Sequence, residues 1–358
     1  MSIIIGCDYH PRFQMIAMLD TKTGEVKVMR LEHENGEAKK FYGSLPKGVL
    51  VGIEATGATQ WFERLMAECG HELWVGDPAE IRARMVRKQK TDERDALHLL
   101  DLLLTNRFPK VWVPSPEERD GRQLLQHRSK LVRMRTAVKN QLHGLAMGQG
   151  LCRKQKLWGE RGRKQLEALE LGRWASRRRE ELLRLLDELD PQIEALDDAV
   201  EAEAARRPEV VRLMELQGVG PVTGLAFVLT LGPVKRFPRS RQLVSYLGLN
   251  PEENSSSTHQ RFGHITKQGN TLMRWLLVEA GQTAARLDPE LRRVYKRLKA
   301  RRGANVAKVA IARRLAVRMY WILRPDPDKA PSIRMSGSPT HSMVGHRPDS
   351  VGTTPSTL

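Results

Sequence analysis

Two carboxylates three residues apart, Asp92 and Asp95, are the side chains of this chain best placed to do chemistry. They lie in the segment RKQKTDERDALHLL (residues 87–100), where a Thr91 or Asp92 cap before good helix formers predicts a helix start. Residues three apart on a helix share one face, so both carboxylates point the same way. The cations that lead into them are Arg82, Arg84, Arg87, Lys88 and Lys90. Such a run suits a site that brings an anionic substrate to a metal ion.

Two further acids end apolar runs that predict strands. Asp8 follows SIIIGC (residues 2–7), and Glu54 follows GVLVGI (residues 48–53). Taken singly, an acid at a strand end or in the first turn of a helix more often caps the backbone or answers the helix dipole. Together, the four acids could converge on a hard divalent cation, which prefers oxygen ligands held by rigid elements. Two such ions would orient an attacking oxygen and stabilise a leaving one at a phosphodiester.

The elements that must position these acids form an α/β pattern. A strand-like run follows Asp8 closely, and a turn at residues 21–24 then leads to another, which predicts an antiparallel start. The helix that begins at Thr91 or Asp92 extends to Leu103 through a series of leucines. The remaining predicted elements of this part are strands at 14–19, 25–31 and 72–75 and a helix at 59–69.

Composition and charge limit the function classes. At 358 residues the chain has room for about two to three domains of roughly 150 residues each. Its net charge of +18 draws it to polyanions, nucleic acid first and acidic membrane second. No apolar run reaches the roughly 20 residues of a membrane span, and the N-terminus is unlike a signal peptide, so we expect a cytoplasmic protein without a membrane partner. Cys7, Cys69 and Cys152 are too far apart to suggest a disulfide framework or a zinc site.

The middle of the chain predicts long helices of opposite charge. Residues 117–139 form an amphipathic pattern with a cationic face, which is either a solvated face or a surface that tracks phosphates. Residues 180–205 carry an apolar stripe between acidic positions, which predicts helix pairing within the chain or between two chains. Asp190 and Pro191 could restart this helix, as cap and first-turn residue.

The rear of the chain contains a glycine turn and a long polar segment. Gly218 and Gly220 precede an apolar helix, as in a helix-hairpin-helix turn that holds a phosphate, but a tight turn without a ligand explains them equally well. Residues 248–270 are polar without an apolar period, which predicts a long loop. Its serines are candidate nucleophiles, although a serine in a polar loop is usually a solvent-facing hydroxyl. Helices are predicted at 271–298 and 304–323, and a disordered tail after residue 325.

Taken together, these motifs resemble the DEDD transposases of the insertion-sequence family called IS110, with its IS1111 branch. The segments that carry the resemblance are IIIGCDYH, VGIEATG, KTDERDALHLL, LQGVGPVTG, LVSYLGLNPEENSSS and HITKQGNTLMRWLLVEA, and it covers roughly residues 3–323. It implies that Asp8, Glu54, Asp92 and Asp95 are the family's catalytic acidic tetrad. The front domain would then be ribonuclease-H-like, of RuvC type, and bind Mg²⁺, with Mn²⁺ as a second possibility.

The resemblance also implies a catalytic serine. The family places it nine residues before the isoleucine of an I-T/S-K-x-G segment, and counting back from Ile265 gives Ser256. The family's following glycine is Ser257 here, which leaves Ser255 and Ser257 as alternative registers. The serine would attack the phosphodiester and hold a covalent protein–DNA link during strand exchange, with the metals assisting from a neighbouring subunit.

Expected partners follow from the same resemblance. They are DNA at the element ends and the target, a noncoding guide RNA that pairs with both, and further copies of the chain in a homodimer or homotetramer. The residues expected to contact nucleic acid are Arg87, Lys88, Lys90, Gly218, Gly220 and Lys267.

The sequence therefore predicts a transposase with an α/β ribonuclease-H-like front domain and mainly α-helical middle and rear domains. The predicted limits are 1–147 for the front domain, 148–207 for a coiled-coil-like linker or oligomerisation segment, 208–325 for the serine-bearing domain and 326–358 for the tail. One alternative is a metal-dependent RuvC-like nuclease or Holliday-junction resolvase in which water attacks. Another is a non-catalytic nucleic-acid-binding protein whose acids are structural.

Overall fold

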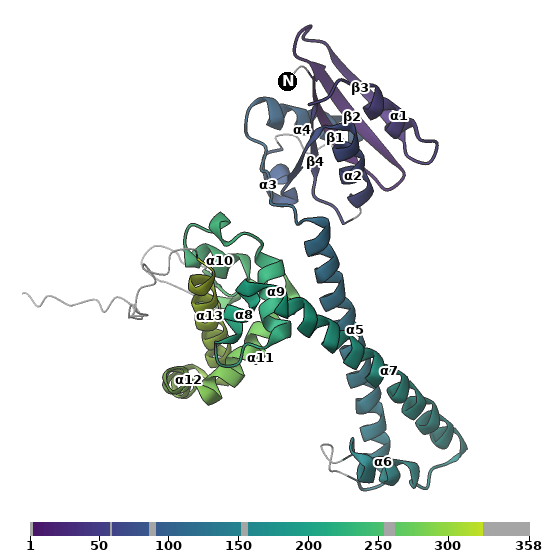
Figure 1. Ribbon diagram of the computed structural model, residues 1–358, viewed down its shortest axis with the longest axis vertical. Coiled ribbons are helices and arrows are strands. Elements are labelled where there is room, and N and C mark those ends of the chain that lie inside the picture. Colours follow the sequence, from purple (N-terminus) through teal and green to yellow (C-terminus); the bar gives the residue numbers. More distant parts are fainter. Residues whose placement is uncertain (1–2, 58, 86–90, 152–156, 254–261, 325–358) are drawn as a thin grey trace, which may run out of the picture. The chain divides into compact units, whose positions relative to one another are not determined.

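The structure, a computed structural model, describes residues 3–57, 59–85, 91–151, 157–253 and 262–324 (Figure 1). The chain divides into two compact units, one up to Ser115 and one from Pro116 onward. The long helix α5 (Pro116–Gly148) belongs to the second unit, whereas the predicted front domain at 1–147 included it. The predicted tail at 326–358 lies outside the described residues. Within them, no helix combines the length and apolar character needed to cross a membrane.

The first unit is built on a five-stranded mixed sheet with the order β3-β2-β1-β4-β5. Strands β1, β2 and β3 pair antiparallel, and β4 and β5 continue the sheet parallel to β1. The elements are β1 (Ile3–Tyr9), β2 (Phe13–Asp20), β3 (Val26–Glu32), α1 (Glu37–Ser44), β4 (Leu50–Glu54), α2 (Gln60–Cys69), β5 (Glu72–Gly76), α3 (Pro78–Ala83) and α4 (Asp92–Leu104). The predicted α/β character of this part is confirmed, and so are its antiparallel start and its helix at Asp92.

Helices cover both faces of this sheet, which explains the unbroken apolar run of β4. On one face, Tyr42 of α1 and Phe62 of α2 pack with Ile5 and Ile53 in a buried cluster. The other face carries α4, and two smaller clusters join it to the sheet. Cys7 is a buried free thiol in the first cluster, as expected of a core cysteine.

Helix α4 lies unusually close to β1 because Gly6 has no side chain. A Cβ atom built on Gly6 would lie 2.3 Å from the carbonyl oxygen of Ala96 and 2.3 Å from the amide nitrogen of Leu100. Ala96 is fully buried and is itself the smallest side chain on that face of the helix. The pair of small residues therefore sets the distance between α4 and the sheet.

The second unit is helical, with one short hairpin. Its elements are α5, α6 (Glu160–Glu167), α7 (Arg173–Ala205), α8 (Pro208–Met214), α9 (Pro221–Leu231), a short 3₁₀ turn (Val234–Arg236), α10 (Ser240–Tyr246), β6 (Pro251–Glu253), β7 (Phe262–Ile265), α11 (Thr271–Leu287), α12 (Pro289–Arg302) and α13 (Ala304–Leu323). Strands β6 and β7 pair antiparallel, so among the described residues of 248–270, where composition predicted a long loop, residues 251–253 and 262–265 are strands. The prediction was wrong because strands of this length contain too few residues to show an alternation of apolar and polar side chains.

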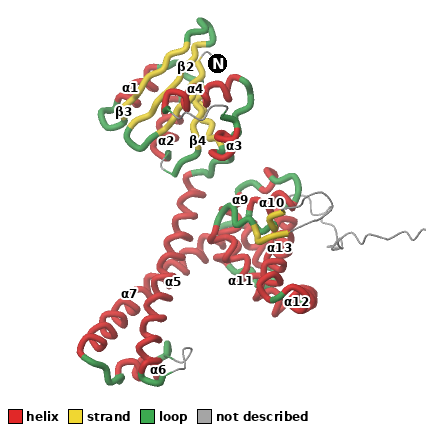
Figure 2. The backbone as a smooth tube through the Cα atoms, turned by 180° about the vertical axis from the view of Figure 1, so that it is seen from behind, coloured by secondary structure: helices red, strands yellow, loops and turns green. Residues whose placement is uncertain are grey.

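Helices α5 and α7 lie side by side as a long hairpin (Figure 2). The middle of the apolar stripe of residues 180–205 is buried inside this hairpin, with Leu189 and Ile193 only 3% and 2% exposed, whereas Val200 packs in the cluster of the rear helices and Leu185 is 36% exposed. The pairing that the sequence left open therefore takes place within the chain. Arg128 and Arg135 of α5 form ion pairs with Asp197 and Asp190 of α7, so acids of α7 neutralise part of the cationic face of α5.

Two predicted helix limits were wrong. Helix α7 runs through Pro191 without a restart, since Leu189 and Ile193 pack on α5 on either side of the proline and Asp190 pairs with Arg135 instead of capping. The predicted helix at 271–298 breaks at Asp288, which caps α12 ahead of Pro289. Proline is favoured at the first position of a helix and disfavours helix in the residue before it.

Asp288 does more than cap, and its removal should destabilise the second unit. Its Oδ1 accepts from the amides of Glu290 and Leu291, and its Oδ2 lies 2.5 Å from Arg318 Nη1. Replacing Asp288 with Ala removes the cap and leaves Arg318, 12% exposed, with only Glu290, so we expect a loss of about 2–3 kcal/mol in the free energy of unfolding by urea titration. The exposed Glu201→Ala is the matched control and should change stability by less than about 0.5 kcal/mol.

The pH dependence of the same contact gives a second readout. Burial raises the pKa of Asp288, but hydrogen bonds from Leu291 and Arg318 outweigh it, so the pKa lies below its ordinary value of 3.8. A carboxyl with a lowered folded-state pKa stabilises above its unfolded pKa and loses that effect as pH falls through the folded value. The stability difference between Asp288→Ala and the original chain should therefore shrink at acid pH. A difference that is constant from neutral to acid pH would contradict the charged pairing.

Candidate metal centre

The strand register brings Asp8 and Glu54 to one edge of the sheet. Strands β1 and β4 are parallel neighbours in which Gly6 pairs with Gly52 and Cys7 with Ile53, so the next step sets Asp8 beside Glu54. Side chains alternate between the two faces of a sheet along a strand. Asp8 is two residues after Gly6 and Glu54 is two residues after Gly52, so both acids lie on the same face as these glycines, which is the face that α4 covers. The carboxyl ends of two adjacent strands thus present acids on the face that α4 covers.

The first turn of α4 supplies the other two acids. Thr91 caps the helix by accepting from the amide of Arg94 at 3.4 Å. Asp92 and Asp95 precede Ala96 and Leu99 by four residues each, and both of these pack on the sheet, so the two aspartates continue the sheet-facing side of the helix. Ala96 and Leu100 of the helix lie against Gly6 of β1. The first turn of the helix, which carries Asp92, therefore lies close to Asp8, two residues further along β1.

Three side chains meet closely at this point, Asp8, His10 and Asp92, and we call them the Asp8 cluster. Each offers a ligand atom within 4.8 Å of the other two. His10 Nε2 lies 3.1 Å from Asp8 Oδ2 and 3.7 Å from Asp92 Oδ1. The cluster is half-buried, with Asp8 the least exposed at 17% of its side chain.

The electrostatics of Asp8 show that the second aspartate of α4 is also near. Burial raises the pKa of Asp8, and the negative charges of Asp95 and Asp92 raise it further, while His10 acts in the opposite direction. The net pKa lies above the ordinary value of an aspartate. Carboxylates held close enough to disfavour one another's charge are the arrangement that a bound cation relieves.

The donor set fits a divalent cation. Asp8 and Asp92, with Asp95 beside them, offer the carboxylate oxygens that hard cations such as Mg²⁺ and Mn²⁺ prefer, and His10 adds one nitrogen. Glu54 lies at the same sheet edge by register but is not a member of the Asp8 cluster. Two of the four predicted acids, Asp8 and Asp92, therefore meet in the Asp8 cluster, while Asp95 acts on Asp8 through its charge and Glu54 follows by strand register.

The sequence interpretation missed His10 as a site residue. Its signal was the spacing Asp-x-His at the end of a strand, which keeps the two side chains in step. The other predicted residues near this end of the chain, Arg87, Lys88 and Lys90, lie outside the described residues. So do Ser255, Ser256 and Ser257, between β6 and β7.

The glycine turn before α9 has a structural reason. Gly218 has a φ of +87°, and a Cβ built on it would lie 2.5 Å from the carbonyl oxygen of Ala280 on α11. Only glycine fits such a left-handed and crowded position. Gly220 caps α9 in open space, ahead of Pro221. The packing supports the tight-turn alternative at Gly218, and phosphate binding by Gly218 and Gly220 stays a prediction.

The base of the β6–β7 hairpin is held by close backbone packing. A Cβ on Gly248 would lie 2.2 Å from the carbonyl oxygen of Gln268, and one on Gly269 would lie 2.3 Å from that of Tyr246. Lys267, between these contacts, adopts the left-handed region with a φ of +55° and is exposed. A non-glycine residue in this region costs roughly 1 kcal/mol or more. The predicted contact of Lys267 with nucleic acid stays a prediction.

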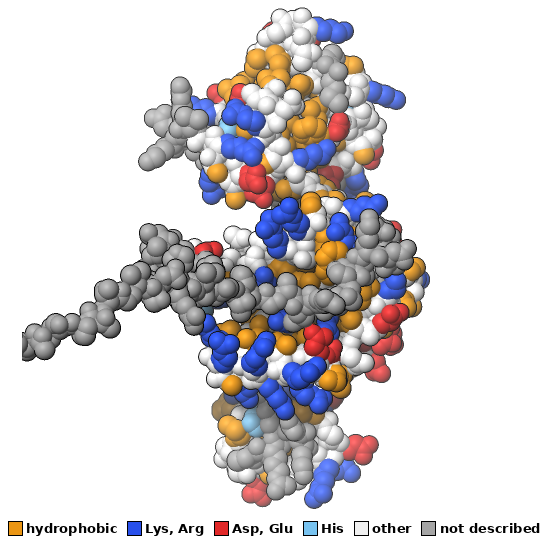
Figure 3. Space-filling view, turned by 90° about the vertical axis from the view of Figure 1, so that its left-hand side faces the viewer, with side chains coloured by type: hydrophobic (Ala, Val, Ile, Leu, Met, Phe, Trp, Pro, Cys, Tyr) orange, Lys and Arg blue, Asp and Glu red, His pale blue; other side chains and the backbone are white. Residues whose placement is uncertain are grey.

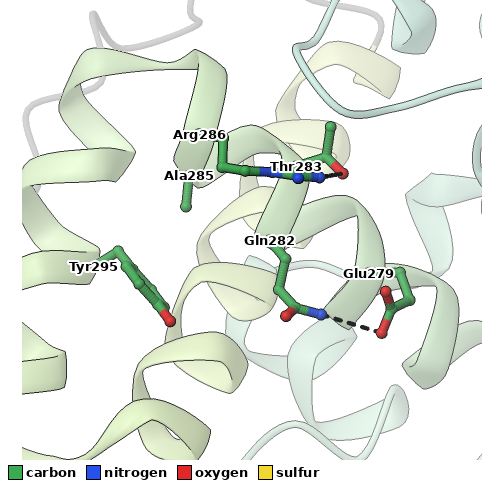
Figure 4. Close-up of a pocket in the computed structure, with 6 residues that line it drawn as sticks. All are labelled: Glu279, Gln282, Thr283, Ala285, Arg286 and Tyr295. Atoms are coloured by element: carbon green, nitrogen blue, oxygen red, sulfur yellow. Dashed lines mark hydrogen bonds between the residues drawn. The ribbon is translucent and has the colours of Figure 1, made fainter. Parts of the chain in front are cut away.

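Positive charge and a pocket mark the surface of the second unit. Lys and Arg side chains are more numerous than Asp and Glu on the face shown in Figure 3. A pocket of about 500 Å³ lies between α11 and α12 (Figure 4). Four of its polar side chains pair with one another, Gln282 with Glu279 and Arg286 with Thr283. None of the predicted site residues lines it.

Comparison with known proteins gives consistent matches along the chain. Residues 5–148 match a family model described as a transposase, of the DEDD IS110 type, and residues 210–296 match the model of the transposase IS116/IS110/IS902 family. A probable family 20 transposase of Pseudomonas aeruginosa is 30% identical over 310 residues, 83% of this chain and 89% of that protein. The transposase for insertion sequence element IS1111A of Coxiella burnetii is 30% identical over 289 residues, 78% of each chain. The transposase for IS1328 of Yersinia enterocolitica is 26% identical over 308 residues.

Proposed function

The chain belongs to the IS110/IS116 family of insertion-sequence transposases, and from this premise we propose that it cuts and rejoins DNA through a serine nucleophile, Ser256, assisted by a divalent metal at Asp8, Glu54, Asp92 and Asp95. The observation that carries the metal site is the Asp8 cluster beneath α4, with Asp95 close enough to raise the pKa of Asp8. The strand order β3-β2-β1-β4-β5, with acids at the ends of β1 and β4 and on one covering helix, supports a ribonuclease-H-like front domain.

The residues of the chain have separate roles in this proposal. The four acids hold Mg²⁺ or Mn²⁺, which supplies positive charge where negative charge develops on the phosphate. Thr91 and Gly6 act indirectly, by fixing the first turn of α4 over the strand ends. Lys and Arg side chains outside the α5–α7 hairpin hold the nucleic-acid backbone. Lys267, at the base of the β6–β7 hairpin, is one of them.

Ser256 carries the covalent step. Its Oγ loses the hydroxyl proton and attacks phosphorus, which forms a serine–phosphate ester to one DNA end, while the bond from phosphorus to the other DNA end breaks and that leaving oxygen takes up a proton and departs as a hydroxyl. Attack by a hydroxyl of another strand reverses the step and rejoins the DNA. In this proposal the metal acts from a neighbouring subunit of a homodimer or homotetramer, and a noncoding RNA from the element selects the DNA by base pairing. Ser255 and Ser257 remain alternative registers.

A covalent-adduct assay tests the serine. The protein is co-expressed with the noncoding flank of its element as RNA, incubated with end-labelled element DNA and Mg²⁺, and separated under denaturing conditions. We expect a DNA-linked protein band that Ser256→Ala abolishes and that Ser255→Ala and Ser257→Ala, the matched controls, retain. DNA cleavage without an adduct, unaffected by Ser256→Ala, would assign the attack to water, and binding without any cleavage would support the non-catalytic alternative.

A further inference from the structure

His10 is held rigidly beside the acids, although it lies past the end of β1. Its amide nitrogen donates to the carbonyl oxygen of Phe13 at 3.0 Å, which closes the tight turn between β1 and β2. Its ring stacks on Phe13, with the ring centroids 4.6 Å apart and the planes at 27°. The guanidinium of Arg30 in turn lies 3.8 Å from the Phe13 ring centroid. Stacking and backbone together therefore fix the orientation of the imidazole before any ligand binds.

The fixed ring directs Nε2 at two carboxylates. It lies 3.1 Å from Asp8 Oδ2 and 3.7 Å from Asp92 Oδ1, and these oxygens come from β1 and from α4. Neighbouring ligand atoms around an ion with bonds of about 2.1 Å are roughly 3 Å apart. The separation of Nε2 from Asp8 Oδ2 matches this spacing, and the separation from Asp92 Oδ1 exceeds it by about 0.7 Å, so a small movement of the Asp92 carboxylate would let the three atoms share one ion.

The nitrogen changes which ion such a site prefers. Mg²⁺ binds through oxygen and retains several waters, so an imidazole gives it little. Transition ions accept imidazole nitrogen readily, and Mn²⁺ accepts both nitrogen and carboxylate oxygen. A site made only of the four predicted acids would lack this preference.

Resting on the proposed function of this site, we propose that His10 Nε2 is a further metal ligand, which makes the centre select a transition-series divalent cation such as Mn²⁺ over Mg²⁺. The ion would be shared by Asp8, Asp92 and His10, and Phe13 acts as the residue that positions the imidazole. The hydrogen bond from His10 to Asp8 describes the same atoms before the ion binds.

Metal binding by the full-length chain tests this directly. Mn²⁺ affinity is measured from the electron paramagnetic resonance signal of free Mn²⁺, Mg²⁺ affinity by competition, and nitrogen ligation from the ¹⁴N modulation of the bound Mn²⁺ spin echo. We expect ¹⁴N coupling in the original chain, its loss in His10→Ala, and a fall in Mn²⁺ affinity of about ten-fold or more with Mg²⁺ affinity changed far less. His33→Ala, a histidine of the same unit outside the Asp8 cluster, is the control and should keep the coupling.

The outcomes separate this inference from the proposed function. Mn²⁺ binding that Asp8→Asn abolishes, but that shows no ¹⁴N coupling and is unchanged in His10→Ala, would leave the acidic metal site standing and overturn the role of His10. Absence of Mn²⁺ binding in the original chain, or binding unaffected by Asp8→Asn, would overturn both. Circular dichroism of each variant confirms that the sheet has folded.

Discussion

Replacing Asp8 with Asn should reduce DNA cleavage by about 10³-fold or more, equivalent to roughly 4 kcal/mol of transition-state stabilisation. Asn keeps the shape of the side chain but removes the charge at the most buried member of the Asp8 cluster. The change also removes the carboxylate that His10 contacts and that Asp92 and Asp95 oppose electrostatically. Affinity for element DNA should stay nearly unchanged, because in the proposed function Lys and Arg side chains outside the Asp8 cluster hold the DNA backbone. Cleavage kinetics and a gel-shift titration measure the two quantities separately.

Glu93→Gln is the matched control for Asp8→Asn. Glu93 lies in the same first turn of α4 as Asp92, but its side chain is exposed and it is outside the Asp8 cluster. Each of the two substitutions removes one negative charge from this part of the first unit, so an effect of net charge alone would appear equally in both variants. We expect cleavage by Glu93→Gln within a few-fold of the original rate. Retained cleavage by Asp8→Asn would contradict the metal site.

Replacing Gly6 with Ala should disable the site without touching any of its ligands. The new Cβ would lie 2.3 Å from two backbone atoms of α4, which cannot turn away as a side chain would. Helix α4 must move outward by about 1 Å, and overpacking of this kind costs about 1–3 kcal/mol. The same movement displaces Asp92 and Asp95 from Asp8, and misplacement by about 1 Å can cost roughly 10²-fold in rate. Urea unfolding and cleavage by the folded fraction measure the two effects.

Gly43→Ala is the control for this change. Gly43 lies in α1 of the same unit, and a Cβ built there meets nothing within 4 Å. Alanine is the better helix former, so stability should be unchanged or slightly raised. If Gly6→Ala behaved like Gly43→Ala in both assays, close packing of α4 on β1 would not position the acids.

Local patterns were enough to predict the elements that carry the acids. The apolar runs before Asp8 and Glu54 predicted strands, and Thr91 before a helix-forming run predicted the start of α4; the structure confirms these elements. These predictions succeed because alternation along a strand and capping at a helix end depend on residues close in the chain. The short strands β6 and β7 were missed because they contain too few residues to show a period. The break at Asp288 was missed although Asp288 and Pro289 are a local signal for a helix boundary.

Contacts between distant residues could not be predicted in the same way. The apolar stripe around Leu189 was compatible with a partner in the same chain or in another, and only the packing of α7 on α5 decided between them. The sequence around Gly218 gave no sign of the close contact with Ala280, which by itself explains the need for glycine.

At the candidate metal centre, local sequence was sufficient to predict the acids and the strands and helix on which they lie. Which of them meet depended on the fold: Asp92 joins Asp8 and His10 in one cluster, while Asp95 and Glu54 lie outside that cluster. The physical reason is that α4 approaches β1 only as closely as Gly6 and Ala96 allow, and the turn after β1 folds the His10 ring back onto Phe13. Both depend on contacts in space, which residue type and spacing do not specify.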